Sequence, residues 1–529
     1  MDIKEPSVHA SARSRSQTAR SAVSAQQTIE SVTMKITIDP VNLLLRKETF
    51  PMLFTYVLDM LVMAFQMYIV WHYIGAAGVA QLSCCYPICY FVSQGVPRAI
   101  AQGAVSTLTK NIADNKIKDA DKTVIYCFVI QFIYLIIALF LAFFLSISFS
   151  QVAGLADTDT NYAAGYIPII CTLGTLFGIF NQATIGLLLA ENKFVINMIR
   201  SVASSLLTLL FQLISYQYSL AQDSKISLTQ LAIGQVIGQF FPAAIMAVYY
   251  QDFKPVSFQG VIKAKLSLLK FANFGEIGQI ALMAAPKISQ FGSSSILQLS
   301  CNIVVTLTFT EASDIEVARI GLFVYWLFFM LFGFVMQSYI YISQAALGLN
   351  LILKKYIRTK DILMQSLIWS IILQGIMLIL GFVMASQIVG FFIPASQQQS
   401  KDFFLLYGKL YIENAPLLPI ILIPYQFCQA LYSIENNWKM NLLINLMHPV
   451  IGIVTLLTIQ FTVGDRADLY YVQFYADLFS GFAALVLLAR KLFEVMQLAK
   501  IELKRLKKMK KKMEEEGLAP HEDEIDKMD

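Results

Sequence analysis

Long apolar runs alternate with short polar breaks along most of this chain, and this pattern dominates every other feature of the sequence. Twelve such runs are long enough to form helices of about 20 residues, the length that crosses a bilayer. They begin near positions 50, 77, 123, 163, 194, 228, 284, 319, 361, 403, 439 and 467. The pattern therefore predicts twelve transmembrane helices, referred to below as spans 1 to 12, and an all-α integral membrane protein.

One long polar interruption near the middle divides these spans into two sets of six. The resulting organisation is a disordered N-terminal tail over 1–45, a six-helix bundle over 46–250, a cytoplasmic linker over 251–270, a second six-helix bundle over 271–495 and a charged C-terminal tail over 496–529. Because lysines in this last tail are interleaved with apolar residues, we expect a surface helix at anionic headgroups, or alternatively a solvated charged helix.

The two sets of spans are similar to each other. A shift of 244 residues places Gln182, Leu187, Glu191, Asn192 and Asn197 on Gln426, Leu431, Glu435, Asn436 and Asn441. Since six spans separate the copies, both copies have the same orientation, and their symmetry axis runs along the membrane normal. The repeat predicts two six-helix bundles that face each other across a central cleft.

Composition supports a membrane protein and indicates its orientation. The chain is 57% hydrophobic and 14% charged, against about 25% charged residues in soluble domains. Its net charge of +5 reports orientation and headgroup contact rather than nucleic-acid binding. The breaks on one side of the membrane carry most basic residues, namely Lys110, Lys116, Lys118, Lys122, Lys193, Arg200, Lys254, Lys263, Lys265, Lys270, Lys354, Lys355, Arg358, Lys360 and Lys439. The other side carries Lys225, Arg319, Lys401 and Arg466. This asymmetry predicts cytoplasmic termini, in the plasma membrane or an endomembrane.

Motifs for enzymatic or metal chemistry are missing from the sequence. All seven cysteines lie within apolar runs, as expected of reduced, packed side chains. The four histidines are scattered, and the one within the apolar runs near the C-terminus, His448, has no partner nearby in the sequence. No phosphate-binding G-x-x-x-x-G-K-[ST] motif occurs. We therefore expect no enzyme, no metal and no cofactor. The N-terminus shows no apolar signal-peptide core, and a mitochondrial transit peptide is the alternative interpretation of its Ser- and Arg-rich composition.

Three passages resemble the multidrug and toxic compound extrusion (MATE) family, which shares a superfamily with lipid-linked oligosaccharide flippases. They are YIGAAGVAQLSCCYPICYFVSQG across spans 1 and 2, QGAVSTLTKN at the end of span 2, and YAAGYIPIICTLGTLFGIFNQATIGLLLAENKF in span 4. In the cytoplasmic turn after span 4, Asn192 replaces a family glycine and can also adopt a left-handed conformation. The resemblance implies export of organic cations or other amphiphiles, driven by inward movement of protons or sodium ions.

One departure from the family concerns ion coupling. Many prokaryotic members resemble one another in an acidic residue eight positions before a glycine that matches Gly75, and the chain has Met67 at that position. Asp59 lies about two turns earlier. Coupling must therefore be inferred from the charges of this chain itself.

A first pair of charges lies deep within spans 1 and 2. An ionised group at the bilayer centre costs ~2.5 to 3.5 kcal/mol, so such residues usually face a cavity or a partner. Asp59 and Arg98 are each ~15 Å from the cytoplasmic ends of their helices at 1.5 Å per residue. They form either a gate or coupling site, or a permanent structural ion pair.

A second group of charges lies in the other half of the chain. Glu413 in span 10 follows Lys409 by one helical turn and precedes Pro416 and Pro419, whose kinks suit cation binding or bending. Simple neutralisation of Glu413 by Lys409 is the alternative. Asp477 lies in span 12 among tyrosines, which either accompany a functional acid or only satisfy its hydrogen bonds.

Three uncharged polar residues are further candidates for the cleft lining. They are Asn181 and Gln182 in span 4 and Gln426 in span 10. Interhelical hydrogen bonds of ~0.6 kcal/mol each are the other explanation for such residues.

These patterns together predict a monomeric secondary transporter of small amphiphilic or cationic molecules, surrounded by lipid and coupled to H⁺ or Na⁺. A flippase of lipid-linked sugars is the nearest alternative, and a cleft lined by several arginines would favour it. A non-transporting receptor or scaffold is a third possibility, although such a protein needs no internal repeat.

Overall fold

A computed structural model of the chain is all-helical in its described residues, which are 40–152, 165–191, 193–223, 226–250, 262–308, 312–392, 417–463 and 471–515. The first half contains α2 (Val41–Tyr73), α3 (Ala76–Tyr90), η1 (Phe91–Gly95), α4 (Val96–Ala113), α5 (Ile117–Val152), α6 (Tyr166–Ile169), η2 (Ile170–Gly174), α7 (Thr175–Ala190), α8 (Phe194–Ala221) and α9 (Leu228–Tyr250). The second half contains η3 (Leu266–Phe271), α10 (Phe274–Thr308), α11 (Ala312–Ile352), α12 (Tyr356–Phe392), α14 (Leu417–Ile434), α15 (Trp438–Thr458), η4 (Ile459–Val463) and α16 (Tyr471–Glu515).

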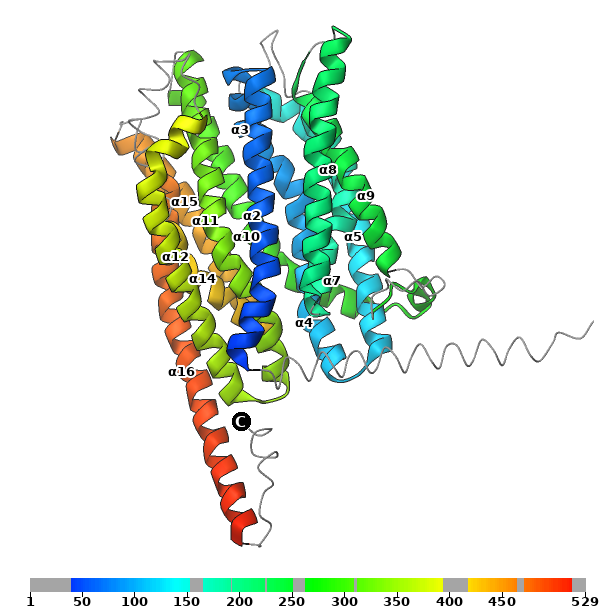
Figure 1. Cartoon of the computed structure of the whole chain (residues 1–529), viewed down its shortest axis with the longest axis vertical. Coiled ribbons are helices and arrows are strands. Elements are labelled where there is room, and N and C mark those ends of the chain that lie inside the picture. Colours follow the sequence, from blue (N-terminus) through cyan, green and yellow to red (C-terminus); the bar gives the residue numbers. More distant parts are fainter. Residues whose placement is uncertain are drawn as a thin grey trace, which may run out of the picture.

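The helices lie roughly parallel to one direction, as expected for a membrane bundle (Figure 1). Within the described ranges, nine helical stretches are long and apolar enough to cross a membrane. With α11, α14 and α16, the helices fall at all twelve positions that the sequence predicts. The all-α, twelve-span architecture is therefore confirmed.

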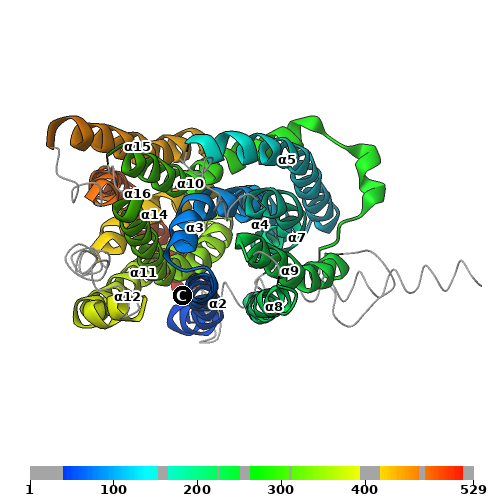
Figure 2. The ribbon, with the colours of Figure 1, turned by 90° about the horizontal axis from the view of Figure 1, so that it is seen from above.

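Seen from above, the helices form two groups (Figure 2). Helices α5, α7, α8 and α9 lie on one side, and α12, α14, α15 and α16 lie on the other. Helices α2, α3 and α4 of the first half pack against α10 and α11 of the second. The two halves thus meet through a few central helices.

Two equivalent acids show the repeat in three dimensions. Glu191, at the end of α7, accepts hydrogen bonds from the Tyr249 hydroxyl of α9 at 3.0 Å and from the Ile262 amide at 3.2 Å. Glu435, at the end of α14, accepts from Lys491 Nζ of α16 at 3.0 Å. In both halves the acid after the fourth span therefore binds the end of the sixth. Asn436 has φ 56°, the left-handed conformation expected for this turn, while Asn192 lies outside the described residues.

Close packing between helices depends on glycine in α9. A Cβ atom at Gly234 would lie 2.4 Å from the backbone of Gln212, and one at Gly238 would lie 2.4 Å from the backbone of Thr208. This G-x-x-x-G spacing lets the backbones of α8 and α9 touch, which is a main source of packing energy in a bilayer.

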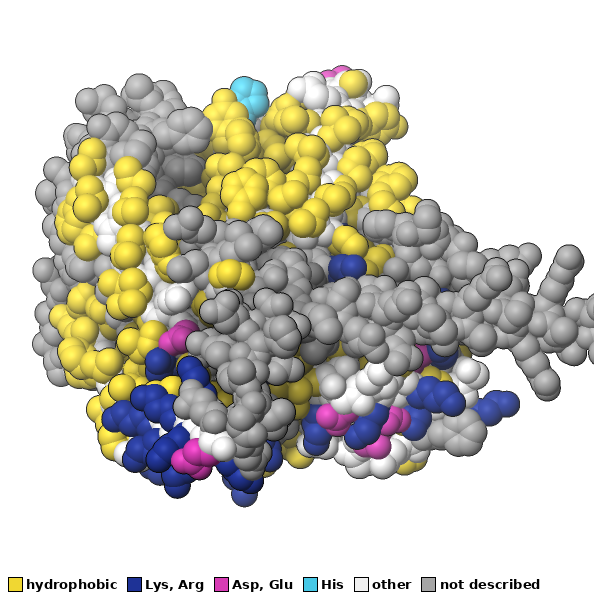
Figure 3. Space-filling model, turned by 60° about the horizontal axis from the view of Figure 1, so that its bottom comes forward, with side chains coloured by type: hydrophobic (Ala, Val, Ile, Leu, Met, Phe, Trp, Pro, Cys, Tyr) yellow, Lys and Arg dark blue, Asp and Glu magenta, His cyan; other side chains and the backbone are white. Residues whose placement is uncertain are grey.

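The surface of the bundle matches a lipid environment. Large apolar side chains on α5 and α12 are well exposed, among them Phe140 at 65% and Val383 at 68%. Lys and Arg side chains gather at one end of the molecule, below the hydrophobic surface (Figure 3). This distribution is typical of an integral membrane protein.

The basic C-terminal segment is helical. It continues α16 without a break to Glu515, so that the helix extends beyond the bundle (Figure 1). Glu502 of this segment accepts a hydrogen bond from the amide of Ile357 at 2.8 Å. The helix continues because Leu503, Leu506 and Met509 lie at helical spacing and no glycine or proline occurs over 482–515.

Candidate functional site

A polar cleft opens among α2, α3, η1, α8 and α9 of the first half, with about 440 Å³ of empty space when the open solvent at its mouth is included. Its lining is polar and aromatic, with Asp59, Val62, Met63, Gln66, Tyr86, Tyr90, Gln94, Ser204, Ser205, Thr208, Gln235 and Gln239. The π-helical turn η1 carries Gln94, and such turns are frequent at functional sites. This cleft is the strongest candidate for a ligand site.

Asp59 supplies the negative charge of the cleft. Its side chain is half-buried, and its Oδ1 accepts a hydrogen bond from Ser201 Oγ of α8 at 2.9 Å. One hydrogen bond leaves carboxylate lone pairs available for a ligand cation.

Three glutamines supply neutral acceptors beside Asp59. In the described part of the chain, no hydrogen-bond partner is found for the buried Oε1 atoms of Gln66, Gln235 and Gln239. Buried polar atoms in membrane proteins are nearly always satisfied, because leaving one without a partner costs about 1 to 3 kcal/mol. These oxygens are therefore suited to accept hydrogen bonds from a bound ligand or water.

Arg98 lies next to the cleft on α4 but does not take the partner that the sequence suggests. Asp59 accepts from Ser201, whereas Arg98 Nη2 donates to the Tyr56 hydroxyl. The guanidinium also stacks on the rings of Tyr56 and Phe291, at 5.1 and 5.7 Å from their centroids. Arg98 thus joins α2, α4 and α10, and it acts on Asp59 at longer range.

Two further cationic side chains, Arg200 and Lys287, are buried, although the sequence does not identify them as deep charges. Arg200 is 6% exposed and donates from Nε to Asn197 Oδ1 at 3.2 Å, whereas the sequence assigns it to a cytoplasmic loop. Lys287 is 5% exposed, and its Nζ donates to Gln290 Oε1 at 3.2 Å. Span 7 is predicted to start near 284 but α10 starts at Phe274, so Lys287 lies deep in the bundle rather than at its edge.

The three uncharged candidates make hydrogen bonds between helices. Asn181 donates to the Gln239 carbonyl at 2.9 Å, and Gln182 donates to Gln94 Oε1 at 3.2 Å. Gln426 accepts from Gln290 Nε2 at 3.0 Å. Gln182 reaches the cleft lining through Gln94, while Asn181 connects α7 to α9.

Asp477 has a partner that the sequence did not reveal. Its Oδ1 lies 2.5 Å from His448 Nε2, and the other ring nitrogen of His448 bonds to Ser293 Oγ. The expectation that His448 lacks a partner is therefore wrong, because helix packing brings together residues from α10, α15 and α16. Glu413 and Lys409 lie outside the described residues.

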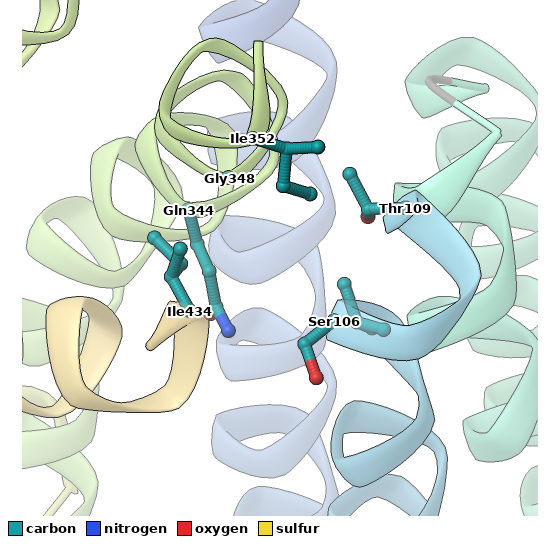
Figure 4. Close-up of a pocket in the computed structure, with 7 residues that line it drawn as sticks. Ser106, Thr109, Gln344, Gly348, Ile352 and Ile434 are labelled. Atoms are coloured by element: carbon teal, nitrogen blue, oxygen red, sulfur yellow. The ribbon is translucent and has the colours of Figure 1, made fainter. Parts of the chain in front are cut away.

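The two halves also contact each other at two places along the bundle, one toward the basic end and one toward the opposite end. Toward the basic end, Ser106 Oγ donates to Asn436 Oδ1 at 2.9 Å beside a small pocket that includes Thr109, Gln344 and Gly348 (Figure 4). Toward the opposite end, Asn302 Nδ2 donates to the carbonyl of Ser83 at 3.4 Å. We call these contacts the inner gate and the outer gate.

Comparison with known proteins identifies the fold. The MatE family model matches residues 51–214. The chain resembles the crystal structure of MATE in complex with MaL6, with 13% identity and a TM-score of 0.69 over 88% of this chain and 99% of that chain. It also resembles an outward-facing multidrug resistance MATE family transporter of the MOP superfamily, with 12% identity and a TM-score of 0.67 over 88% and 98% of the two chains.

A third similar structure is a MOP superfamily transporter from Pyrococcus furiosus, with 14% identity and a TM-score of 0.70 over 88% of this chain and 98% of that chain. No curated protein sequence matches the chain. At these identities the structural likeness shows a shared fold, and the family model matches less than half of the chain. The chain therefore has the fold of the MATE structures, and its first half contains the region that matches the MatE family model. The long apolar helices among the described residues indicate an integral membrane protein.

Proposed function

We propose that this protein is a member of the MATE family and a secondary active transporter, working as a monomer, that exports organic cations in exchange for protons or sodium ions. The observation that carries the proposal is the composition of the cleft. One carboxylate, three glutamine oxygens without a described partner and two tyrosine rings all attract a cation. The rings of Tyr86 and Tyr90 stack with centroids 6.2 Å apart and provide an aromatic wall.

Exchange follows from competition for one acid. A proton or a sodium ion neutralises the same Asp59 carboxylate that an organic cation would use, so binding of one favours release of the other. Repeated binding and release then moves the two ions in opposite directions if the cleft alternates between the two sides. The inner and outer gates are the contacts that would open in turn. Both termini would lie in the cytoplasm, in the plasma membrane or an endomembrane.

Glu413 remains a second proposed coupling acid in span 10, where Lys409 is its nearest charged neighbour in sequence. We expect Glu413→Gln to abolish coupled transport while leaving the protein folded. Transport at the wild-type rate in this variant would remove Glu413 from the proposed mechanism.

Binding of a fluorescent lipophilic cation to purified protein tests the site directly. Asp59→Asn should weaken binding by about 10- to 150-fold, because a hydrogen bond to a charged group contributes about 1.5 to 3 kcal/mol. Asp223→Asn is the matched control, since Asp223 is an exposed aspartate in the turn before α9. Equal affinity of Asp59→Asn and the control would contradict the proposed cation site.

Buried cations near the cleft support a second candidate, a flippase of lipid-linked or other anionic amphiphiles. Arg98, Arg200 and Lys287 are each at most 6% exposed, so the interior carries more deep positive charge than the sequence indicates. The similar Pyrococcus furiosus transporter is described as having a binding pocket of reverse polarity. Binding of an anionic dye that is lost when Lys287 is substituted, but kept when Asp59 is substituted, would favour this candidate.

A further inference from the structure

The second half contains a buried chain of three side chains on three different helices. Asp477 of α16 bonds to His448 Nε2 of α15 at 2.5 Å, and His448 Nδ1 bonds to Ser293 Oγ of α10. Ser293, His448 and Asp477 are 3%, 5% and 0% exposed. We refer to these residues as the Ser–His–Asp chain.

The roles of donor and acceptor within this chain follow from its chemistry. An ionised aspartate only accepts hydrogen bonds, so a neutral His448 carries its proton on Nε2 and donates to Asp477. His448 Nδ1 then accepts from the Ser293 hydroxyl. In this form the Ser–His–Asp chain has a net charge of −1, and such a charge is energetically unfavourable for groups away from water.

Addition of one proton removes that charge. The proton binds to His448 Nδ1, which then donates to Ser293 Oγ, while the serine hydroxyl turns toward a backbone carbonyl of its own helix. Asp477 and His448 now form a neutral ion pair, and no bond between heavy atoms changes. We propose that His448 is a proton-binding site of the second half, separate from the Asp59 cleft.

A nucleophilic role, as in hydrolases with the same three residue types, does not fit this location. The Ser293 side chain is 3% exposed within α10, so its oxygen cannot reach a substrate carbonyl in this structure. The Ser–His–Asp chain instead lies where binding of a proton would change the contacts among α10, α15 and α16.

The surroundings of His448 include groups from each helix that packs on α15. The Tyr425 ring of α14 lies 6.3 Å from the imidazole, centroid to centroid, and its hydroxyl donates to Asn445 Oδ1 at 3.0 Å. On α10, Lys287 lies six residues before Ser293 and donates to Gln290. Asp477 on α16 is the acid in direct contact with the ring. η4 has no ionisable side chain.

Helix α10 links this site to movement of the two halves. It carries Ser293 and also Ala284, whose backbone packs against Gly103 of α4 in the first half. A change in the hydrogen bond between Ser293 and His448 therefore acts on the helix that holds the halves together. This role in coupling rests on the proposed antiport function, whereas proton binding by His448 does not.

Nuclear magnetic resonance of protein labelled with ¹⁵N-histidine tests proton binding without any transport. The His448 signal is assigned as the one lost in His448→Gln, and His72→Gln, which removes an exposed histidine at the end of α2, is the control. We expect the His448 signal to change from that of a neutral imidazole to that of an imidazolium ion as the pH is lowered while the protein stays folded. A signal that stays that of a neutral imidazole until the protein unfolds would overturn the inference.

Reconstituted protein then tests the coupling. Proton-driven dye accumulation should fall on the order of ten-fold in His448→Gln, while exchange of labelled for unlabelled dye without a gradient should persist. His72→Gln should behave like the wild type in both assays. Driven accumulation at the wild-type level in His448→Gln would overturn the coupling role, whereas absence of any dye exchange in the wild type would contradict the proposed function instead.

Discussion

A side chain at Gly103 should force apart the two halves of the helix bundle. A Cβ atom there would lie 2.7 Å from Ala284 N, 2.9 Å from Ala284 Cα and 2.9 Å from the Ile280 carbonyl oxygen. These neighbours are backbone atoms of α10, so they cannot rotate away as a side chain can. Helices α4 and α10 must separate instead, and overpacking of this kind costs about 1 to 3 kcal/mol.

This cost falls on the state in which the inner gate is closed. Since the same contact need not exist when the gate is open, Gly103→Ala should shift the equilibrium toward the open state by about 5- to 150-fold. Thr109 reports the shift, because it lies beside the inner gate and is 7% exposed in the closed state. In a Thr109→Cys background, Gly103→Ala should raise the initial rate of labelling by a membrane-impermeant maleimide added to the cytoplasmic side.

The matched control is Gly375→Ala in the same Thr109→Cys background. An added Cβ at Gly375 of α12 meets no atom within 4 Å, and the substitution has the same effect on helix propensity. All seven native cysteines are buried and should contribute a low background. Equal labelling rates in the Gly103 and Gly375 variants would show that the crossing of α4 and α10 at Gly103 does not control the inner gate.

Two other predictions concern stability and the linker. Gly238→Val should lower the melting temperature, because its Cβ would lie 2.4 Å from the Thr208 backbone and overpacking of this kind costs about 1 to 3 kcal/mol of stability. Gly375→Val is the control. An unchanged melting temperature in Gly238→Val would contradict the close packing of α8 and α9. Asp121→Asn should speed tryptic cleavage at Lys265, because the buried Asp121 carboxylate binds Lys265 Nζ at 2.5 Å and such a bond contributes about 1.5 to 3 kcal/mol. Unchanged cleavage would show that this ion pair does not hold the end of the linker.

The sequence predicts the architecture well because hydropathy and repetition are local signals. Apolar runs locate the helices, and the aligned acids Glu191 and Glu435 even occupy equivalent positions in the two halves. Asp59 could be identified from its depth in span 1, since a charge inside an apolar run is conspicuous.

The partners of the deep charges could not be read in the same way. His448 and Asp477 are 29 residues apart on different helices, so their contact depends on how α15 and α16 rotate against each other. Arg200 was counted with the cytoplasmic loop over 190–200, although it lies within α8, which begins at Phe194. Lys287 was placed at the start of span 7, near 284, whereas α10 begins at Phe274, so this lysine lies deeper than its sequence position suggested. Contacts and depth therefore required the three-dimensional structure.

The most direct test of the proposed transporter is dye accumulation in proteoliposomes that contain the purified full-length protein. A fluorescent organic cation is added outside, and a proton gradient and then a sodium gradient are imposed. We expect accumulation under one of these gradients, and its loss in Asp59→Asn but not in Asp223→Asn. Equal dye levels with and without both gradients, or undiminished accumulation in Asp59→Asn, would contradict cation antiport through this cleft.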